Sequence, residues 1–167
     1  MTRSRHNIRP LRRPADRRPG AAFSLVELLF VIAIIAIIAA MAMPKYGRSV
    51  ARYRAQCAAR RVAADLVLAR ASAKSASAAR AVTFNTVACS YTLGGVRHLD
   101  HASQPYTVTL SDAPYHATLY YADFGGAPQA LFDMYGAPKW GGKVIVRVGE
   151  FEQTVSMAAD DGSVTVQ

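Results

Sequence analysis

The sequence predicts an α+β protein in which a long N-terminal helix, transmembrane in its first half, packs on a C-terminal antiparallel β domain. The first observation is an apolar run of twenty-one residues, Phe23 to Met43, that contains one charged residue, Glu27. The second is an alanine-rich stretch with helical spacing that extends to Arg80, and the third is a series of short β-rich runs separated by turn residues. We therefore divide the 167 residues into four segments, 1–22, 23–43, 44–80 and 81–167.

The formal net charge of +9 is unevenly distributed along the chain. Residues 1–22 carry seven arginines and one aspartate, a net charge of +6, and residues 45–80 carry nine basic residues and one aspartate, a net charge of +8. Residues 81–167 carry four basic and eight acidic residues, a net charge of −4. This distribution excludes a uniformly basic nucleic-acid-binding domain and indicates a basic leader, a basic helix and a mildly acidic C-terminal domain.

The leader precedes a segment that is long enough to cross a membrane. Residues 1–22 hold three prolines and few apolar residues, so we expect them to be disordered and, being positively charged, to stay on the cytoplasmic side. At about 1.5 Å per residue, residues 23–43 span roughly 30 Å, the thickness of a hydrocarbon core. A carboxylate such as Glu27 costs about 2.5–3.5 kcal/mol at the membrane centre and less near an end, so it needs a partner. Pro44 removes a backbone donor, and we expect it to bend or interrupt the helix.

The segment after Pro44 is predicted to continue as a helix that ends near residues 77–81. Residues 45–80 contain no proline and a single glycine. Apolar residues recur there at steps of three and four, and we expect this stripe to dock on the downstream domain. The stripe comprises Val50, Tyr53, Cys57, Ala64, Val67 and Ala71.

Eight β-strands are predicted after Arg80, separated by turn residues such as Gly94-Gly95 and Asp160-Asp161-Gly162. Their expected ranges are 81–87, 89–93, 106–110, 118–121, 130–134, 143–148, 151–157 and 163–166. Gly149-Glu150 between two of them suits the type II′ turn of a two-residue hairpin. We expect the clustered aromatic residues to lie in the core; they are Tyr115, Tyr120, Tyr121 and Phe124.

Three interpretations compete for residues 23–43. An ordinary secretory signal peptide fits the basic leader and the small residues of Ala40-Met41-Ala42, but the run is longer than usual for such a signal and Glu27 lies inside it. A plain signal anchor fits the length but gives Glu27 no role. The third interpretation gives every one of these features a role.

The residues Ala22-Phe23-Ser24-Leu25-Val26-Glu27-Leu28 resemble the type III signal of type IV pilins and pseudopilins. The resemblance implies that a prepilin peptidase cuts between Ala22 and Phe23 and then methylates the new amino group, which gives N-methylphenylalanine. Glu27 falls at the fifth mature position and Pro44 at the twenty-second, where the family has a glutamate and often a proline. Ala22 stands where the family usually has glycine, and a cut after Gly20 would place the glutamate seventh.

Cleavage at this point would create a positively charged amine at Phe23, four residues before Glu27. In a filament, the amine of one subunit can meet the carboxylate of a neighbour. Opposite charges couple strongly where water is excluded, and each relieves the desolvation of the other. We therefore assign Glu27 as an assembly residue.

The C-terminal half narrows the resemblance to the GspH/FimT family. The residues concerned are Leu131-Phe-Asp-Met-Tyr-Gly136-Ala-Pro, Gly141-Gly-Lys-Val-Ile-Val146, Phe151-Glu-Gln-Thr-Val155 and Asp161-Gly-Ser-Val-Thr-Val166, together with the helical Ala63-Ala-Asp-Leu-Val-Leu-Ala-Arg70-Ala. The resemblance implies a pilin-like fold and a non-catalytic minor pseudopilin, near the tip of a type II secretion pseudopilus that exports proteins across the outer membrane. The alternative it implies is a minor pilin of a type IV pilus, involved in pilus assembly or DNA uptake.

The resemblance also implies a location and a set of partners. The protein would cross the bacterial inner membrane once, with its N-terminus cytoplasmic and its C-terminal domain periplasmic, before it joins a pseudopilus or pilus. Its partners would be prepilin peptidase, other pilins or pseudopilins, the inner-membrane assembly platform and membrane lipid. We expect no cofactor.

Two other function classes fit the sequence less well. A metalloenzyme would need ligands such as His98, His101 and His116, but no third ligand can be placed beside the first two, and we predict no metal and no catalytic site. We rank nucleic-acid binding below a scaffold role, because the C-terminal domain is net acidic. Cys57 and Cys89 would form a disulfide in an oxidising compartment or serve as two small buried apolar residues, and we favour the second interpretation.

Overall fold

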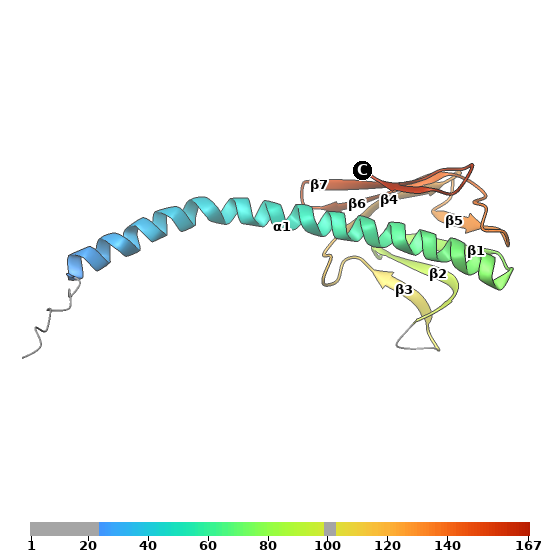
Figure 1. Ribbon diagram of the computed structural model, residues 1–167, viewed down its shortest axis with the longest axis horizontal. Coiled ribbons are helices and arrows are strands. Elements are labelled where there is room, and N and C mark those ends of the chain that lie inside the picture. Colours follow the sequence, from blue (N-terminus) through green and yellow to red (C-terminus); the bar gives the residue numbers. More distant parts are fainter. Residues whose placement is uncertain (1–23, 99–102) are drawn as a thin grey trace, which may run out of the picture. The chain divides into compact units, whose positions relative to one another are not determined.

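The computed structural model describes residues 24–98 and 103–167, which form one helix and eight strands (Figure 1). The elements are α1 (Leu25–Ala76), β1 (Arg80–Asn85), β2 (Ser90–Arg97), β3 (Pro105–Thr109), β4 (Thr118–Phe124), β5 (Gln129–Phe132), β6 (Gly142–Val148), β7 (Phe151–Met157) and β8 (Val164–Val166). The chain divides into two compact units, one ending at Met41 and the other comprising residues 42–167. The predicted fold class, a long N-terminal helix and antiparallel sheets, is confirmed.

The helix α1 runs for 52 residues and belongs to both units. Its helical backbone continues through Pro44, so the chain is not interrupted there, and the predicted bend stays a prediction. The helix ends just before the range expected from the sequence. Ser77 adopts a left-handed conformation (φ 46°), and the amide of Ala78 donates to the carbonyl of Ala73 (3.2 Å). This is the Schellman arrangement, which satisfies carbonyls that the last helical turn leaves open.

The face of α1 that docks on the β domain is not the predicted stripe. The buried face consists of Ala55, Ala58, Ala59, Val62, Leu66, Ala69 and Ala73. The predicted stripe is wrong: Tyr53 is 66% exposed and Val67 53% exposed, and Ala64 and Ala71 are exposed too. Both faces of the helix show helical spacing. The alanine face packs against the sheets because its small side chains allow the helix to approach them most closely.

The strands form two antiparallel sheets of four. Sheet A has the order β3-β2-β1-β5 and sheet B the order β4-β6-β7-β8. In Figure 1, the part of α1 within the second unit runs along both sheets. Side chains on the inner faces of both sheets alternate with outward-facing ones, as a half-buried strand requires. Together with the alanine face of α1 they form one core, whose larger members include Phe84, Tyr91, Leu93, Phe124, Phe132 and Val146.

All eight predicted strands are present, with ends shifted by a few residues. The pair Gly94-Gly95 is not a turn but lies inside β2, whose register with β3 shifts between Leu93 and Arg97. Gly95 has a positive φ (75°), and the guanidinium of Arg80 lies where its Cβ would be. The positive φ favours glycine, and together with the shift of register it marks a bulge. The predicted hairpin at Gly149 (φ 58°) joins β6 to β7.

The prediction that the clustered aromatic residues are all core residues is wrong for two of them. Phe124 is buried and Tyr115 packs against the core, but Tyr120 and Tyr121 are exposed, Tyr120 at 55%. The register of β4 with β6 shifts between Leu119 and Tyr121, so the strict alternation of inward and outward side chains is lost at this point. The guanidinium of Arg147 then stacks on the Tyr120 ring, 3.8 Å from its centroid.

The loop after β5 closes over the last turns of α1. Gly136 has a positive φ (74°), and a Cβ there would come within 3.1 Å of the Arg70 carbonyl oxygen and closer still to the Lys74 side chain. The Nε of Arg70 donates to the Gly136 carbonyl (3.2 Å). The glycine that the sequence analysis singled out four residues after Phe132 thus serves a close approach between loop and helix.

Two adjacent residues of α1 test the corrected docking face. We expect Leu66→Ala to lower the free energy of unfolding by about 2–5 kcal/mol, because it leaves a cavity at a side chain that is 1% exposed. The matched control, Val67→Ala, should change it by less than about 0.5 kcal/mol. Chemical denaturation of the detergent-solubilised protein measures both. If Val67→Ala cost more unfolding free energy than Leu66→Ala, the face predicted from the sequence would be the docking face after all.

Candidate functional site

The predicted processing site, Ala22 and Phe23, lies outside the described residues. The structure begins at Ser24, whose carbonyl accepts the first helical hydrogen bond, from the Leu28 amide (3.0 Å). Glu27 therefore lies in the first turn of α1. A carboxylate at this position is favoured by the partial positive charge of a helix N-terminus.

The first unit exposes nearly all of its apolar surface. The large hydrophobic side chains between Leu25 and Met41 are each at least 43% exposed. Among the described residues, one helix is long and apolar enough to cross a membrane, and this segment supplies that part of it. Exposing such a large apolar surface to water is unfavourable, so lipid or other apolar helices must cover it.

Glu27 is the one charged residue on this surface, and it is exposed. Within the described part of the chain, no side chain forms an ion pair with it. The pairing of Glu27 with an amine of a neighbouring subunit stays a prediction.

In the second unit, one carboxylate of α1 is buried against sheet A. Asp65 is 4% exposed and is the one acidic residue among residues 45–80. The hydroxyl of Tyr91 on β2 donates to Asp65 Oδ2 (2.6 Å), and that of Tyr106 on β3 donates to Oδ1 (3.1 Å). Arg61, one turn earlier, donates to Oδ2 through its Nε (3.0 Å) and to the Tyr106 hydroxyl through Nη2.

We call this cluster of four residues the Asp65 network; its hydrogen bonds hold α1 against sheet A. Burial, and after it the Asp65 carboxylate, raises the pKa of Tyr91 and of Tyr106 above the ordinary value. Both hydroxyls thus remain protonated donors at neutral pH, and the carboxylate keeps its partners. We did not predict this network from the sequence. Its signal is a lone acid in a basic helix, four residues after an arginine.

The opposite face of α1 carries most of the apolar stripe that sequence spacing had predicted to dock on the β domain. We give the name outer stripe to its exposed members together with the neighbouring Leu68: Tyr53, Ala64, Val67, Leu68 and Ala71. The exposed Arg60 lies within the same stretch of helix. An exposed row of apolar residues with tyrosine and arginine beside it has the composition of a protein–protein contact surface.

The remaining candidate residues do not come together. Cys57 and Cys89 are free thiols of intermediate burial, one on α1 and the other in the β1–β2 turn. Among the described residues, no group of three metal-ligating side chains is present. His98 lies beside Tyr106, with ring centroids 6.1 Å apart, His116 lies in the loop before β4, and His101 lies outside the described residues.

Comparison with known proteins gives one family match and a fold likeness. Residues 17–43 match the family model described as the prokaryotic N-terminal methylation motif. No curated protein sequence matches the chain. A crystal structure of the type IV minor pilin FimU of Pseudomonas aeruginosa PAO1 aligns with a TM-score of 0.52 and 17% identity over 70% of this chain and 90% of that one. A second crystal form of FimU gives 0.48 and 15% over 67% and 91%.

The family match and the fold likeness differ in how much of the chain they cover. The methylation motif covers the end of the leader and the apolar segment, whereas the fold likeness covers most of the chain. The chain is therefore type IV pilin-like: it carries an N-terminal methylation motif and has a pilin-like α+β fold. Both features are those that the predicted non-catalytic structural subunit would have.

Replacing the buried carboxylate tests the Asp65 network. We expect Asp65→Ala to lower the free energy of unfolding by about 3 kcal/mol, because it strands two buried hydroxyls and an arginine. The matched control is Asp112→Ala, which removes an exposed carboxylate and should cost less than about 0.5 kcal/mol. Denaturant titration of the detergent-solubilised protein measures both, and equal costs would refute the structural role.

Proposed function

We propose that this protein is a minor pseudopilin, a scarce structural subunit near the tip of a type II secretion pseudopilus that serves protein export across the outer membrane. The observation that carries the proposal is the placement of Glu27. It lies in the first turn of an exposed apolar helix, five residues after Ala22, inside the segment that matches the methylation motif. An ordinary signal peptide or a plain signal anchor gives that carboxylate no use.

In this proposal, the protein first crosses the inner membrane once, with residues 1–22 in the cytoplasm and the β domain in the periplasm. Prepilin peptidase cuts between Ala22 and Phe23 and methylates the amine of Phe23. The amine stays charged, and in the filament it pairs with the Glu27 carboxylate of a neighbouring subunit. Both groups leave water or lipid headgroups at that step, so each is stabilised only by the other.

The filament also supplies a cover for the exposed apolar surfaces. Residues 25–41 leave the lipid and pack against equivalent helices of other subunits, and the inner-membrane assembly platform drives this transfer. The outer stripe lies on the free face of α1 in the second unit and provides a further contact surface. The proposal thus gives a partner to each large apolar surface described above.

The second candidate is a minor pilin of a type IV pilus, with a role in pilus assembly or DNA uptake. The observation that favours it is the likeness of the fold to the minor pilin FimU. The two candidates differ in the phenotype of a deletion strain. Loss of protein secretion with normal pili supports the pseudopilin, and loss of pili with normal secretion supports the pilin.

The mature N-terminus tests the processing step. We expect mass spectrometry of the protein isolated from membranes to find N-methylphenylalanine at Phe23, because the motif places the cut there. A strain that lacks prepilin peptidase is the control, and it should retain Met1. A mature chain that begins at Met43 would instead establish an ordinary signal peptide, and a wild-type chain that begins at Met1 would establish a plain anchor.

The charge on Glu27 tests the assembly step. We expect Glu27→Ala and the isosteric Glu27→Gln to insert in the membrane at wild-type levels but to be lost from sheared filaments, since the neighbour's amine would have no counter-charge. The control, Ser24→Ala, changes the residue just before α1, three residues from Glu27, without changing charge. Immunoblots of the membrane and filament fractions give both readouts. Normal incorporation of Glu27→Gln would refute the pairing.

A further inference from the structure

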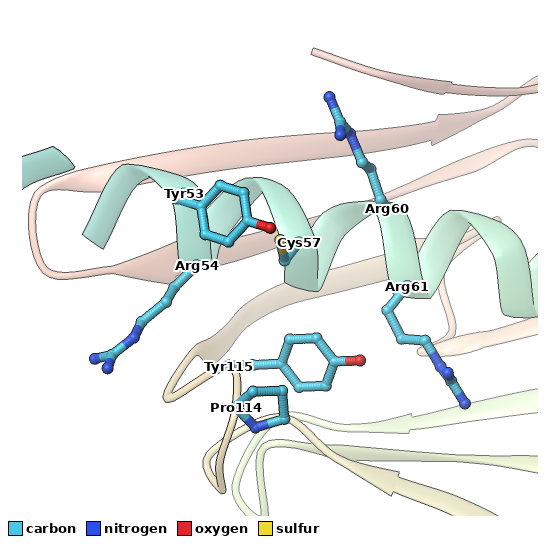
Figure 2. Close-up of a pocket in the computed structure, with 7 residues that line it drawn as sticks. All are labelled: Tyr53, Arg54, Cys57, Arg60, Arg61, Pro114 and Tyr115. Atoms are coloured by element: carbon cyan, nitrogen blue, oxygen red, sulfur yellow. The ribbon is translucent and has the colours of Figure 1, made fainter. Parts of the chain in front are cut away.

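A half-open cavity of about 460 Å³ lies between α1 and the loop that joins β3 to β4 (Figure 2). Tyr53 and Cys57 line it from the helix, and Pro114 and Tyr115 line it from the loop. In Figure 2, the two tyrosine rings lie on opposite sides of the opening. We call this cavity the tyrosine pocket; its walls are mostly aromatic and apolar, as suits an apolar side chain.

Three arginines of α1 surround the tyrosine pocket, and two of them have no counter-charge. Arg61 belongs to the Asp65 network and is already satisfied. Arg54 and Arg60 form no ion pair within the described residues. Both residues line the pocket, and Figure 2 shows their side chains extending away from the two rings, so the apolar walls remain open. An occupant that carries negative charge beside an apolar group would satisfy both features.

The position of the tyrosine pocket indicates where such an occupant would come from. Tyr53 belongs both to the pocket and to the outer stripe, so the pocket opens at one end of the surface proposed to contact other subunits. The helix and the β domain also carry opposite net charges, +8 on residues 45–80 and −4 on residues 81–167. A neighbour with the same charge distribution would bring an acidic β domain to this basic helix.

We infer that the tyrosine pocket receives an apolar side chain from an acidic segment of a neighbouring pilin-like subunit, whose carboxylate pairs with Arg54 or Arg60. This inference rests on the proposed function, because it needs a filament. The ring faces of Tyr53 and Tyr115 hold the apolar group, and the two arginines select a partner that carries negative charge. This contact would determine which subunit binds beside this one, whereas the Glu27 pairing sets the axial register of the filament.

Charge reversal in the full-length protein tests the inference in cells. We expect Arg54→Glu and Arg60→Glu each to reduce the amount in sheared filaments by about tenfold, with unchanged levels in the membrane. Arg54→Lys keeps the charge and should retain most of the incorporation. Lys139→Glu reverses an exposed charge outside the tyrosine pocket and is the matched control. Unchanged incorporation of both glutamate variants would overturn the inference.

A photo-crosslinker identifies the occupant. With p-benzoylphenylalanine in place of Tyr115, irradiation of intact cells should join this position to an acidic peptide of another pilin-like subunit, which mass spectrometry sequences. A crosslink to phospholipid, to nucleic acid or to no protein would overturn the inference. The Glu27 variants separate the two levels: if Glu27→Gln is excluded from filaments while Arg54→Glu and Arg60→Glu enter normally, the pocket contact fails and the proposed function stands.

Discussion

The hydrogen bonds that Asp65 accepts from Tyr91 and Tyr106 determine how α1 lies on its domain. A carboxylate that has left water is tolerated only while its donors stay in place, so the helix cannot rotate or slide without stranding it. The orientation of every other side chain on this part of α1 follows. Leu66 and Ala69 face the sheets, whereas Val67 faces outward. The outer stripe and one wall of the tyrosine pocket thus depend on a buried charge on the other side of the helix.

One glycine and one serine in a left-handed conformation fix the far end of the same helix. Gly136 lets the loop after β5 approach Arg70, and the left-handed Ser77 ends the helix and turns the chain toward β1. The helix of the second unit is thereby held at its middle by charge and at its end by close packing. The first unit has no such support within the described chain, and its apolar surface depends on lipid or on other subunits for cover.

The sequence alone predicted the fold class, the eight strands and the motif around Glu27, because each depends on local periodicity, turn residues or residue spacing. It could not predict features that depend on which segments meet. Spacing identified the stripe through Tyr53 and Val67 correctly as apolar, but only the fit of alanines against two sheets decides that this stripe faces outward. The same holds for the bulge that exposes Tyr120 and for the pocket shared by Tyr53 and Tyr115, which lie sixty-two residues apart in the chain.

The alanines that face the sheets have a consequence for how this chain can diversify. Where Ala55, Ala58, Ala59, Ala69 and Ala73 lie, a larger side chain would push the helix away from its domain, so these positions are closed to change. Positions on the other side meet no such steric limit, and substitutions there cost the fold almost nothing. A lineage of such subunits can therefore exchange its contacts one residue at a time while the architecture beneath stays the same.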